Sequence, residues 1–163
     1  MLDLVDKHDE VISTMHRNEV YEKGLQNFRV VNCFIENSEG KLWVPRRAPH
    51  KRIFPNGLDM SMGGHVDSGE TYDIAFKREL MEELNLDADV VGYEYLGKLT
   101  PEEHNVSAFM QVYKIHTDTV PAYNPEDFTE SFWFTPQDLM EKLAQGDTSK
   151  EDLPKLVRHF FLT

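Results

Sequence analysis

The stretch that decides the fold covers residues 62–86 and reads MGGHVDSGETYDIAFKRELMEELNL. Between residues 71 and 84 it contains neither Gly nor Pro, which are the strongest interrupters of helices. Apolar residues recur there at helical spacing: Phe76, Leu80 and Leu84, with Ile74 and Met81 widening the stripe. The pattern predicts a helix with one buried side. Residues 48–70, rich in Pro, Gly, Asn and Asp, predict a long loop before it, with a short strand around residues 58–62.

Three carboxylates lie on one arc of this helix, beside the apolar stripe rather than opposite it: Glu79, Glu82 and Glu83. Residues three and four apart share a helix face, so like charges at this spacing repel by roughly 0.2–0.5 kcal/mol per pair in water. Arg78, four residues before Glu82, is the local cation. An acidic, solvent-facing helix would explain the triplet. A hard cation such as Mg²⁺, which prefers carboxylate oxygens, would explain it too.

The spacing around the triplet resembles the signature of the Nudix hydrolase family, Gly-x5-Glu-x7-Arg-Glu-U-x-Glu-Glu-x-Gly-U, where U is aliphatic. Eight of the nine specified positions agree: Gly64, Glu70, Arg78, Glu79, Leu80, Glu82, Glu83 and Leu86. The departure is Asn85, where the family has Gly. Asn is the residue after Gly that best tolerates left-handed backbone, so we expect the turn that follows the helix to be kept.

The resemblance implies an α/β fold, an α/β/α sandwich with a mixed sheet that carries a loop–helix–loop catalytic motif. It also implies hydrolysis of a nucleoside diphosphate linked to another moiety. Carried over position by position, Glu82 and Glu83 bind Mg²⁺ or Mn²⁺ directly, and Glu79 is a further ligand or the base that acts on water. Gly63, just before the motif, contributes its backbone carbonyl to the metal.

The resemblance gives two further positions a bracing role, because Glu70 and Arg78 hold the motif together in the family. A fourth acidic ligand often comes from outside the motif. Glu130, at the start of an expected strand, is our candidate for it, with Glu102 and Glu103 behind it; surface charge is the alternative explanation for all three.

A basic cluster in RRAPHKR stands out in a chain that is otherwise short of positive charge: Arg46, Arg47, Lys51 and Arg52. Such side chains suit the oxygens of a small-molecule diphosphate substrate, which Arg engages with two hydrogen bonds at once. A solvated basic loop is the competing interpretation. The sequence leaves open which diphosphate compound is cut.

Residues 3–17, the RRAPHKR segment and the GGH before the motif resemble one branch of the family, that of isopentenyl diphosphate isomerase. The isomerase site uses a cysteine immediately before Gly-His and a glutamate in the strand after the motif. Gly63 and Asn105 take these places here, and neither side chain transfers a proton to or from carbon. Of the isomerase's histidine ligands only His65 has a clear counterpart, and His16 is a weaker candidate for a second. We therefore expect a hydrolase, with an isomerase-like enzyme and a non-catalytic nucleotide-binding module as the alternatives.

The rest of the chain reads as further strands and helices around the motif. A hairpin is expected over residues 28–47, with its turn at Gly40. Further expected elements are strands over residues 90–100, 106–117 and 130–135, and helices over residues 136–146 and 153–161. This order predicts a mixed sheet with helices on its faces.

The composition bounds the function. The 163 residues suit one domain, residues 1–163, and a net charge of −12 argues against binding a nucleic-acid polymer. No apolar run approaches the ~18 residues of a membrane span, and the first residues lack the basic start of a secretory signal. Cys33 is the one cysteine, so no internal disulfide forms and a reducing cytoplasm is the simplest compartment. Family members often pair through sheets or helices, which leaves a homodimer open.

Overall fold

The computed structural model of the protein describes residues 1–162. Its strands are β1 (Leu2–Val5), β2 (Val11–Met15), β3 (Arg29–Glu36), β4 (Leu42–Arg47), β5 (Met62–His65), β6 (Glu94–Leu99), β7 (Phe109–His116) and β8 (Phe128–Phe134). Its helices are α1 (Arg17–Glu22), α2 (Tyr72–Leu84), α3 (Ala88–Val91), α4 (Pro101–His104), α5 (Pro136–Ala144) and α6 (Asp152–Phe161).

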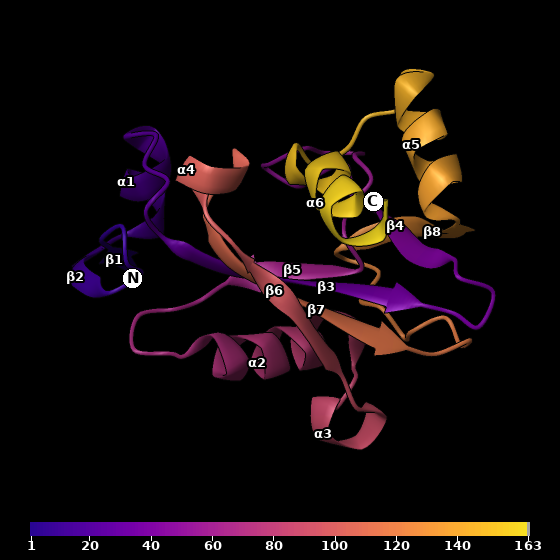
Figure 1. Ribbon diagram of the computed structural model, residues 1–163, viewed down its shortest axis with the longest axis horizontal. Helices are drawn as coiled ribbons and strands as arrows, with labels where there is room; N and C mark the ends of the chain where they lie inside the picture. The colour runs from indigo at the N-terminus through magenta and orange to yellow at the C-terminus, as the bar shows by residue number, and fades with distance from the viewer. Residues whose placement is uncertain (163) are drawn as a thin grey trace.

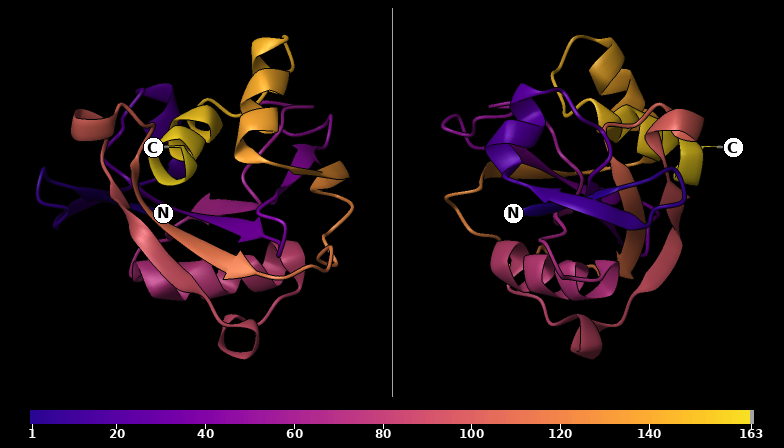
Figure 2. Two further views of the ribbon diagram at one scale, coloured as in Figure 1. Left: turned by 45° about the vertical axis from the view of Figure 1, so that its right-hand side comes forward. Right: turned by 90° about the vertical axis from the view of Figure 1, so that its left-hand side faces the viewer.

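A mixed sheet forms the middle layer. Its strands follow the order β6-β7-β3-β4-β8, and β5 pairs with β3 off this path. β3 and β7 run parallel, whereas the other pairs in the sheet are antiparallel. Helix α2 covers one face of the sheet, and α5 and α6 cover the other (Figure 1; Figure 2). The α/β/α sandwich with a mixed sheet is thus confirmed.

The two faces of the sheet follow the strand period of two. Val31, Cys33 and Ile35 of β3 are buried in one apolar cluster with α2. Phe34, between Cys33 and Ile35, is buried in a second cluster with α5 and α6. Cys33, on the side of β3 that faces α2, is a free thiol and is fully buried. The sandwich therefore has two cores, one on each face of the sheet.

Helix α2 has the predicted bounds because both of its ends are capped. The Thr71 side chain accepts a hydrogen bond from the Ile74 amide at the start of the helix. Asn85 ends the helix in left-handed backbone, with φ of 54°, so the turn is kept without the family's Gly. The predicted width of the apolar stripe was wrong: Ile74 and Met81 are 55% and 47% exposed, and Tyr72 and Ala75 pack inward instead.

Several local predictions were also wrong. The short strand, β5, lies at residues 62–65 rather than 58–62. β5 pairs with the part of β3 that was expected to pair with β4 in a full hairpin. β3 and β4 therefore pair only at Glu36 and Leu42, beside the predicted turn at Gly40. Residues 88–91 form α3 rather than the start of a strand, and β8 begins at residue 128. The elements β1, β2, α1 and α4 were not predicted.

The N-terminal hairpin of β1 and β2 forms a separate two-stranded sheet at one end of the molecule (Figure 1). β1 is buried along its whole length, whereas β2 is mostly exposed. Leu2 and Leu4 share a small apolar cluster with Val20 of α1 and Phe28. None of the helices within residues 1–162 is long and apolar enough to span a membrane.

Candidate active site

The close approach of α2 to β5 positions the acidic motif. β5 pairs with β3 through Gly63 and Gly64, which lie opposite Asn32 and Val31. A Cβ atom on Gly64 would lie only 2.3 Å from the Cδ atom of Glu79. The bare backbone of Gly64 therefore provides the space that the Glu79 carboxylate occupies, which explains why a glycine begins the motif.

Arg78 joins the loop, the strand and the helix of the motif. Its Nε and Nη2 atoms donate to the two carboxylate oxygens of Glu70, at 2.8 and 2.7 Å. Nη2 also donates to the backbone oxygen of His65 at 3.1 Å, and Nη1 donates to Glu79 at 2.9 Å and to Glu82 at 3.3 Å. These hydrogen bonds lower the pKa of the Glu70 carboxyl, which therefore stays ionised beside the arginine.

Glu83 is a carboxylate withdrawn from solvent with few donors around it. Its one hydrogen bond within residues 1–162 comes from the Gly63 amide, at a long 3.4 Å. Burial raises the pKa of Glu83 well above its usual range, the carboxylates of Asp59 and Glu79 raise it further, and Lys150 opposes them. Burial also raises the pKa of Glu79, although the hydrogen bond from Arg78 opposes that shift. The negative charge around Glu83 therefore exceeds the positive charge that the chain places beside it.

Asp59 adds to this excess of negative charge. Its Oδ2 atom accepts a hydrogen bond from Arg47 at 2.8 Å. Its Oδ1 atom is buried without a hydrogen-bond partner among the described residues, and Lys150 Nζ lies 3.9 Å from it. A buried acceptor without a donor costs free energy unless something else fills the place.

The donor set fits a hard divalent cation. Mg²⁺ binds carboxylate and carbonyl oxygens. Glu79 and the backbone of Gly63 lie beside Glu83, whose carboxylate is incompletely neutralised. Glu82, by contrast, is largely exposed and turned to Arg78. Within residues 1–162 no three His, Cys, Asp or Glu side chains already stand at metal-binding geometry. The residues are thus of the right type for a metal, and in this structure Glu79 and Glu82 are paired with Arg78.

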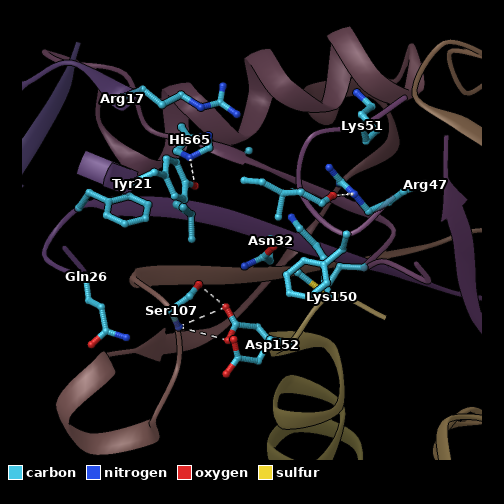
Figure 3. Close-up of a pocket in the computed structure, with 18 of the residues that line it drawn as sticks. Arg17, Tyr21, Gln26, Asn32, Arg47, Lys51, His65, Ser107, Lys150 and Asp152 are labelled. Atoms are coloured by element: carbon cyan, nitrogen blue, oxygen red, sulfur yellow. Dashed lines mark hydrogen bonds between the residues drawn. The ribbon is translucent and has the colours of Figure 1, made fainter. Parts of the chain in front are cut away.

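A cavity of about 470 Å³ opens beside Glu79 and Glu83. This volume suits a ligand of small-molecule size. Its wall includes four cationic side chains: Arg17, Arg47, Lys51 and Lys150. Figure 3 shows Arg17, Arg47 and Lys51 around the part of the cavity near α2. Carboxylates, which suit a divalent cation, and cationic side chains, which suit phosphate, therefore border one space.

The structure divides the basic cluster predicted from RRAPHKR. Arg47 and Lys51 border the cavity. Arg46 turns away to a network of its own, with ion pairs to Glu130 at 2.8 Å and to Asp147 at 3.0 Å. Arg52 contacts Asn18 at 3.4 Å and is not part of the cavity wall.

The predicted outside ligands also lie apart from the cavity. Glu130 is half exposed and paired with Arg46, and it does not border the cavity. Glu102 and Glu103 lie on the short helix α4, and neither borders the cavity. Asn105, expected where the isomerase has its glutamate, ends α4 in left-handed backbone, with φ of 57°.

His65 lies in the cavity wall but is already engaged. Its Nε2 atom is 2.6 Å from the Tyr21 hydroxyl, and its ring stacks on Phe28 with centroids 5.8 Å apart. Burial, together with the charges of Arg17, Lys150 and Arg78, lowers the pKa of His65 to about 3, so the ring is neutral at neutral pH. His16, the other histidine to compare with the isomerase, is exposed at the start of α1. The two histidines do not form a metal-binding pair.

Sequence reasoning missed much of the cavity wall. The missed polar residues of the wall are Arg17, Tyr21, Gln26, Asn32, Ser107, Lys150, Glu151 and Asp152, and Asp59 beside Glu83 was missed as well. They come from segments spread over most of the chain, and none belongs to a motif of fixed spacing. Asp59 carried one available signal, since it is an acidic residue in an apolar run just before the glycines.

Comparison with known proteins identifies the family. The model of the NUDIX domain matches residues 26–156. An uncharacterized Nudix hydrolase from Nostoc is 57% identical over 161 residues, which cover 99% of this chain and 95% of that protein. A crystal structure from Deinococcus radiodurans has a TM-score of 0.93 and 44% identity over 98% of both chains. The chain therefore belongs to the Nudix hydrolase family, whose enzymes act on phosphoric anhydride bonds.

The resemblance to the isomerase branch is confirmed as a more distant one. An isopentenyl-diphosphate Delta-isomerase from Kocuria rhizophila is 28% identical over 141 residues, which cover 84% of this chain and 78% of that protein. Its similarity is about half that of the Nostoc relative, which is named a hydrolase. The chain is therefore similar to both branches of the family, and the more similar of these two relatives is named a hydrolase.

Proposed function

We propose that this enzyme is a Mg²⁺-dependent pyrophosphohydrolase, with Mn²⁺ as a substitute metal, that cleaves the diphosphate bond of a nucleoside di- or triphosphate or of a nucleoside diphosphate derivative. The observation that supports this proposal most is the incomplete neutralisation of the Glu83 carboxylate. A half-buried carboxylate beside Glu79 and Asp59, with one long hydrogen bond, is costly without a cation and useful with one.

Each residue of the motif has a task in this proposal. Glu82, Glu83 and the backbone carbonyl of Gly63 hold the metal, and Glu79 is a further ligand or accepts the proton of the attacking water. A bound Mg²⁺ would neutralise diphosphate charge and acidify a bound water. The burial that raises the pKa of Glu79 makes it a better proton acceptor than an exposed carboxylate. Arg78 and Glu70 brace the motif.

The cations of the cavity wall hold the phosphates. Arg47 and Lys51 from the predicted cluster, with Arg17 and Lys150, border the cavity beside the carboxylates. Arg46 and Arg52 are left out of this proposal because they bind other partners. Glu130 is left out of the ligand set for the same reason, and Asp59, with its unpaired oxygen, is the better candidate for an acid from outside the motif.

The test is a screen of nucleoside di- and triphosphates, nucleotide sugars, dinucleoside polyphosphates and isopentenyl diphosphate, with and without Mg²⁺. Phosphorus NMR of products formed in ¹⁸O-labelled water identifies the bond that is cut. Calorimetric titration of the protein with Mg²⁺ alone gives a readout independent of turnover. Metal-dependent release of phosphate, pyrophosphate or a nucleoside monophosphate supports the hydrolase. Conversion of isopentenyl diphosphate would support the isomerase, and binding without product the non-catalytic module.

We extend the proposal to a cytoplasmic enzyme formed by one domain, residues 1–163. The buried free Cys33 supports the compartment, because the protein has no disulfide to protect.

A further inference from the structure

The cavity has two ends of different chemistry. Near α2 lie the carboxylates of the motif and the cationic side chains Arg17, Arg47 and Lys51. Figure 3 shows Gln26, Ser107 and Asp152 at the other side, close to α4 and α6. A carboxylate repels phosphate, so the end that contains Asp152 suits a different part of a bound molecule. A nucleoside phosphate has such a part, its base.

Asp152 is held firmly at this end. It is 8% exposed at the start of α6, and it accepts hydrogen bonds from the Ser107 amide at 3.2 and 3.3 Å and from the Ser107 hydroxyl. Within residues 1–162 all of its hydrogen bonds come from Ser107. An ionised carboxylate has about four lone-pair positions, so Asp152 keeps acceptor capacity toward the cavity.

The cavity wall also has apolar and aromatic members. Phe28, Val30 and Met60 contribute to it, and Tyr21 packs edge-on against Phe28 with centroids 5.6 Å apart. Such a surface accommodates a planar ring and leaves its polar edge to be satisfied at the far end. The polar edge of the ligand would then meet Asp152.

We propose that Asp152, positioned by Ser107, selects substrates by accepting a hydrogen bond from an amino group on the base of a nucleoside phosphate. The inference rests on the proposed function and adds to it the class of base. An amino group places N–H donors against the carboxylate. A carbonyl at the same position places lone pairs against the carboxylate and leaves its remaining acceptor positions unfilled, which is the stronger source of discrimination.

The experiment uses substrate pairs in which an amino group is exchanged for a carbonyl and the neighbouring ring nitrogen gains a hydrogen: cytidine against uridine triphosphate, and adenosine against inosine triphosphate. The full-length enzyme with Mg²⁺ is expected to favour the amino member of each pair in kcat/KM. Asp152→Asn replaces one acceptor oxygen by an NH₂ donor at nearly the same shape. The preference is expected to fall by about tenfold or to invert, chiefly through KM, as for the exchange of one charged hydrogen bond.

Two control variants separate specificity from folding. Asp138→Asn removes an equal charge from the first turn of α5, outside the cavity, and should leave the preference unchanged. Ser107→Ala removes the hydroxyl that holds Asp152 and should reduce the preference without inverting it. A role limited to holding Ser107 would lower the thermal midpoint of Asp152→Asn and leave the substrate ratio as it was.

The outcomes that overturn the inference are distinct from those that overturn the proposed function. If the wild-type enzyme cuts both members of each pair equally well, the selection by Asp152 is refuted whether or not the variant folds. If it cuts no nucleotide with any metal, the proposed function fails. In that case, calorimetric binding of the same pairs without metal still tests the selection: equal dissociation constants refute it, and a preference lost in Asp152→Asn supports it.

Discussion

Asp9 and Glu83 are both carboxylates withdrawn from solvent, and the chain surrounds them in opposite ways. Asp9 lies in the turn between β1 and β2, and it accepts hydrogen bonds from Arg29 at 2.7 Å and from Tyr72 at 2.7 Å and forms an ion pair with Lys98. Glu83 has one long hydrogen bond and three acidic neighbours. The first carboxylate is fully compensated within the fold, and the second is not.

The pKa values follow this contrast. Burial alone would raise the pKa of Asp9, but the hydrogen bonds from Lys98, Arg29 and Tyr72 lower it below its usual range. The pKa of Glu83 is raised. Because Arg29, Tyr72 and Lys98 belong to β3, α2 and β6, Asp9 ties the N-terminal hairpin to the main sheet and to α2. A compensated buried charge thus serves the structure, whereas an uncompensated one indicates a ligand.

The largest expected effect is the loss of turnover in Glu83→Gln. The substitution keeps the shape and removes the charge that the metal requires, so kcat should fall by about 1,000-fold, or roughly 4 kcal/mol of transition-state stabilisation. Without metal, the free energy of unfolding should not decrease, because an uncompensated buried charge has been removed. Steady-state kinetics and urea denaturation measure the two quantities. Unchanged hydrolysis would place the metal elsewhere.

The equivalent substitution Asp9→Asn should have the opposite pattern. It leaves Arg29 and Lys98 without their carboxylate, so the free energy of unfolding should fall by about 3 kcal/mol, as when one partner of a buried ion pair is removed. Asn tolerates the left-handed backbone of position 9, where φ is 62°, so the loss reports on charge rather than strain. The kcat of the folded fraction should stay close to that of the wild type. If Asp9→Asn were as stable as the wild type, the proposed difference between Asp9 and Glu83 would be refuted.

The same contrast explains how much could be predicted from the sequence. Glu79, Glu82 and Glu83 were found because a helix repeats its geometry, so spacing alone places them on one arc. The bounds of α2 followed from Thr71 and Asn85, which are local signals. The two exposed apolar residues of α2 were assigned inward because spacing gives the direction of a stripe and not its width, which depends on the facing sheet.

The cavity and the Asp9 network could not be predicted in this way. The cavity brings together residues that are far apart in the sequence, among them Arg17, Asn32, Lys150 and Asp152. No local sequence pattern records that arrangement. The same holds for Asp9, whose partners lie in distant elements. Glu130, predicted as a metal ligand from its acidity, pairs with Arg46 across β4 and β8. Charge in a sequence does not state which partner neutralises it.

A smaller effect on catalysis is expected from Gly64→Ala. The new methyl group would overlap the Glu79 carboxylate, which is held in place by Arg78, so the carboxylate must move by about an ångström. A displacement of that size lowers kcat by about tenfold to hundredfold. The substitution should add little in a Glu79→Gln background, because it acts through Glu79. Equal losses in both backgrounds would show that Gly64 acts by another route.

The smallest effect is a pH dependence that distinguishes the wild type from Asp9→Asn. Since the folded-state pKa of Asp9 is lowered, its contribution to stability is fully present above the unfolded-state value of about 3.9 and is lost as the pH falls through the folded-state value. The difference in free energy of unfolding between the two proteins should therefore be constant from pH 7 to pH 5 and should shrink below pH 4. Urea denaturation at each pH measures it. A difference that stays constant into strong acid would mean that Asp9 stabilises the hairpin through its shape and hydrogen bonds alone, and the comparison with Glu83 would then rest on geometry rather than on charge.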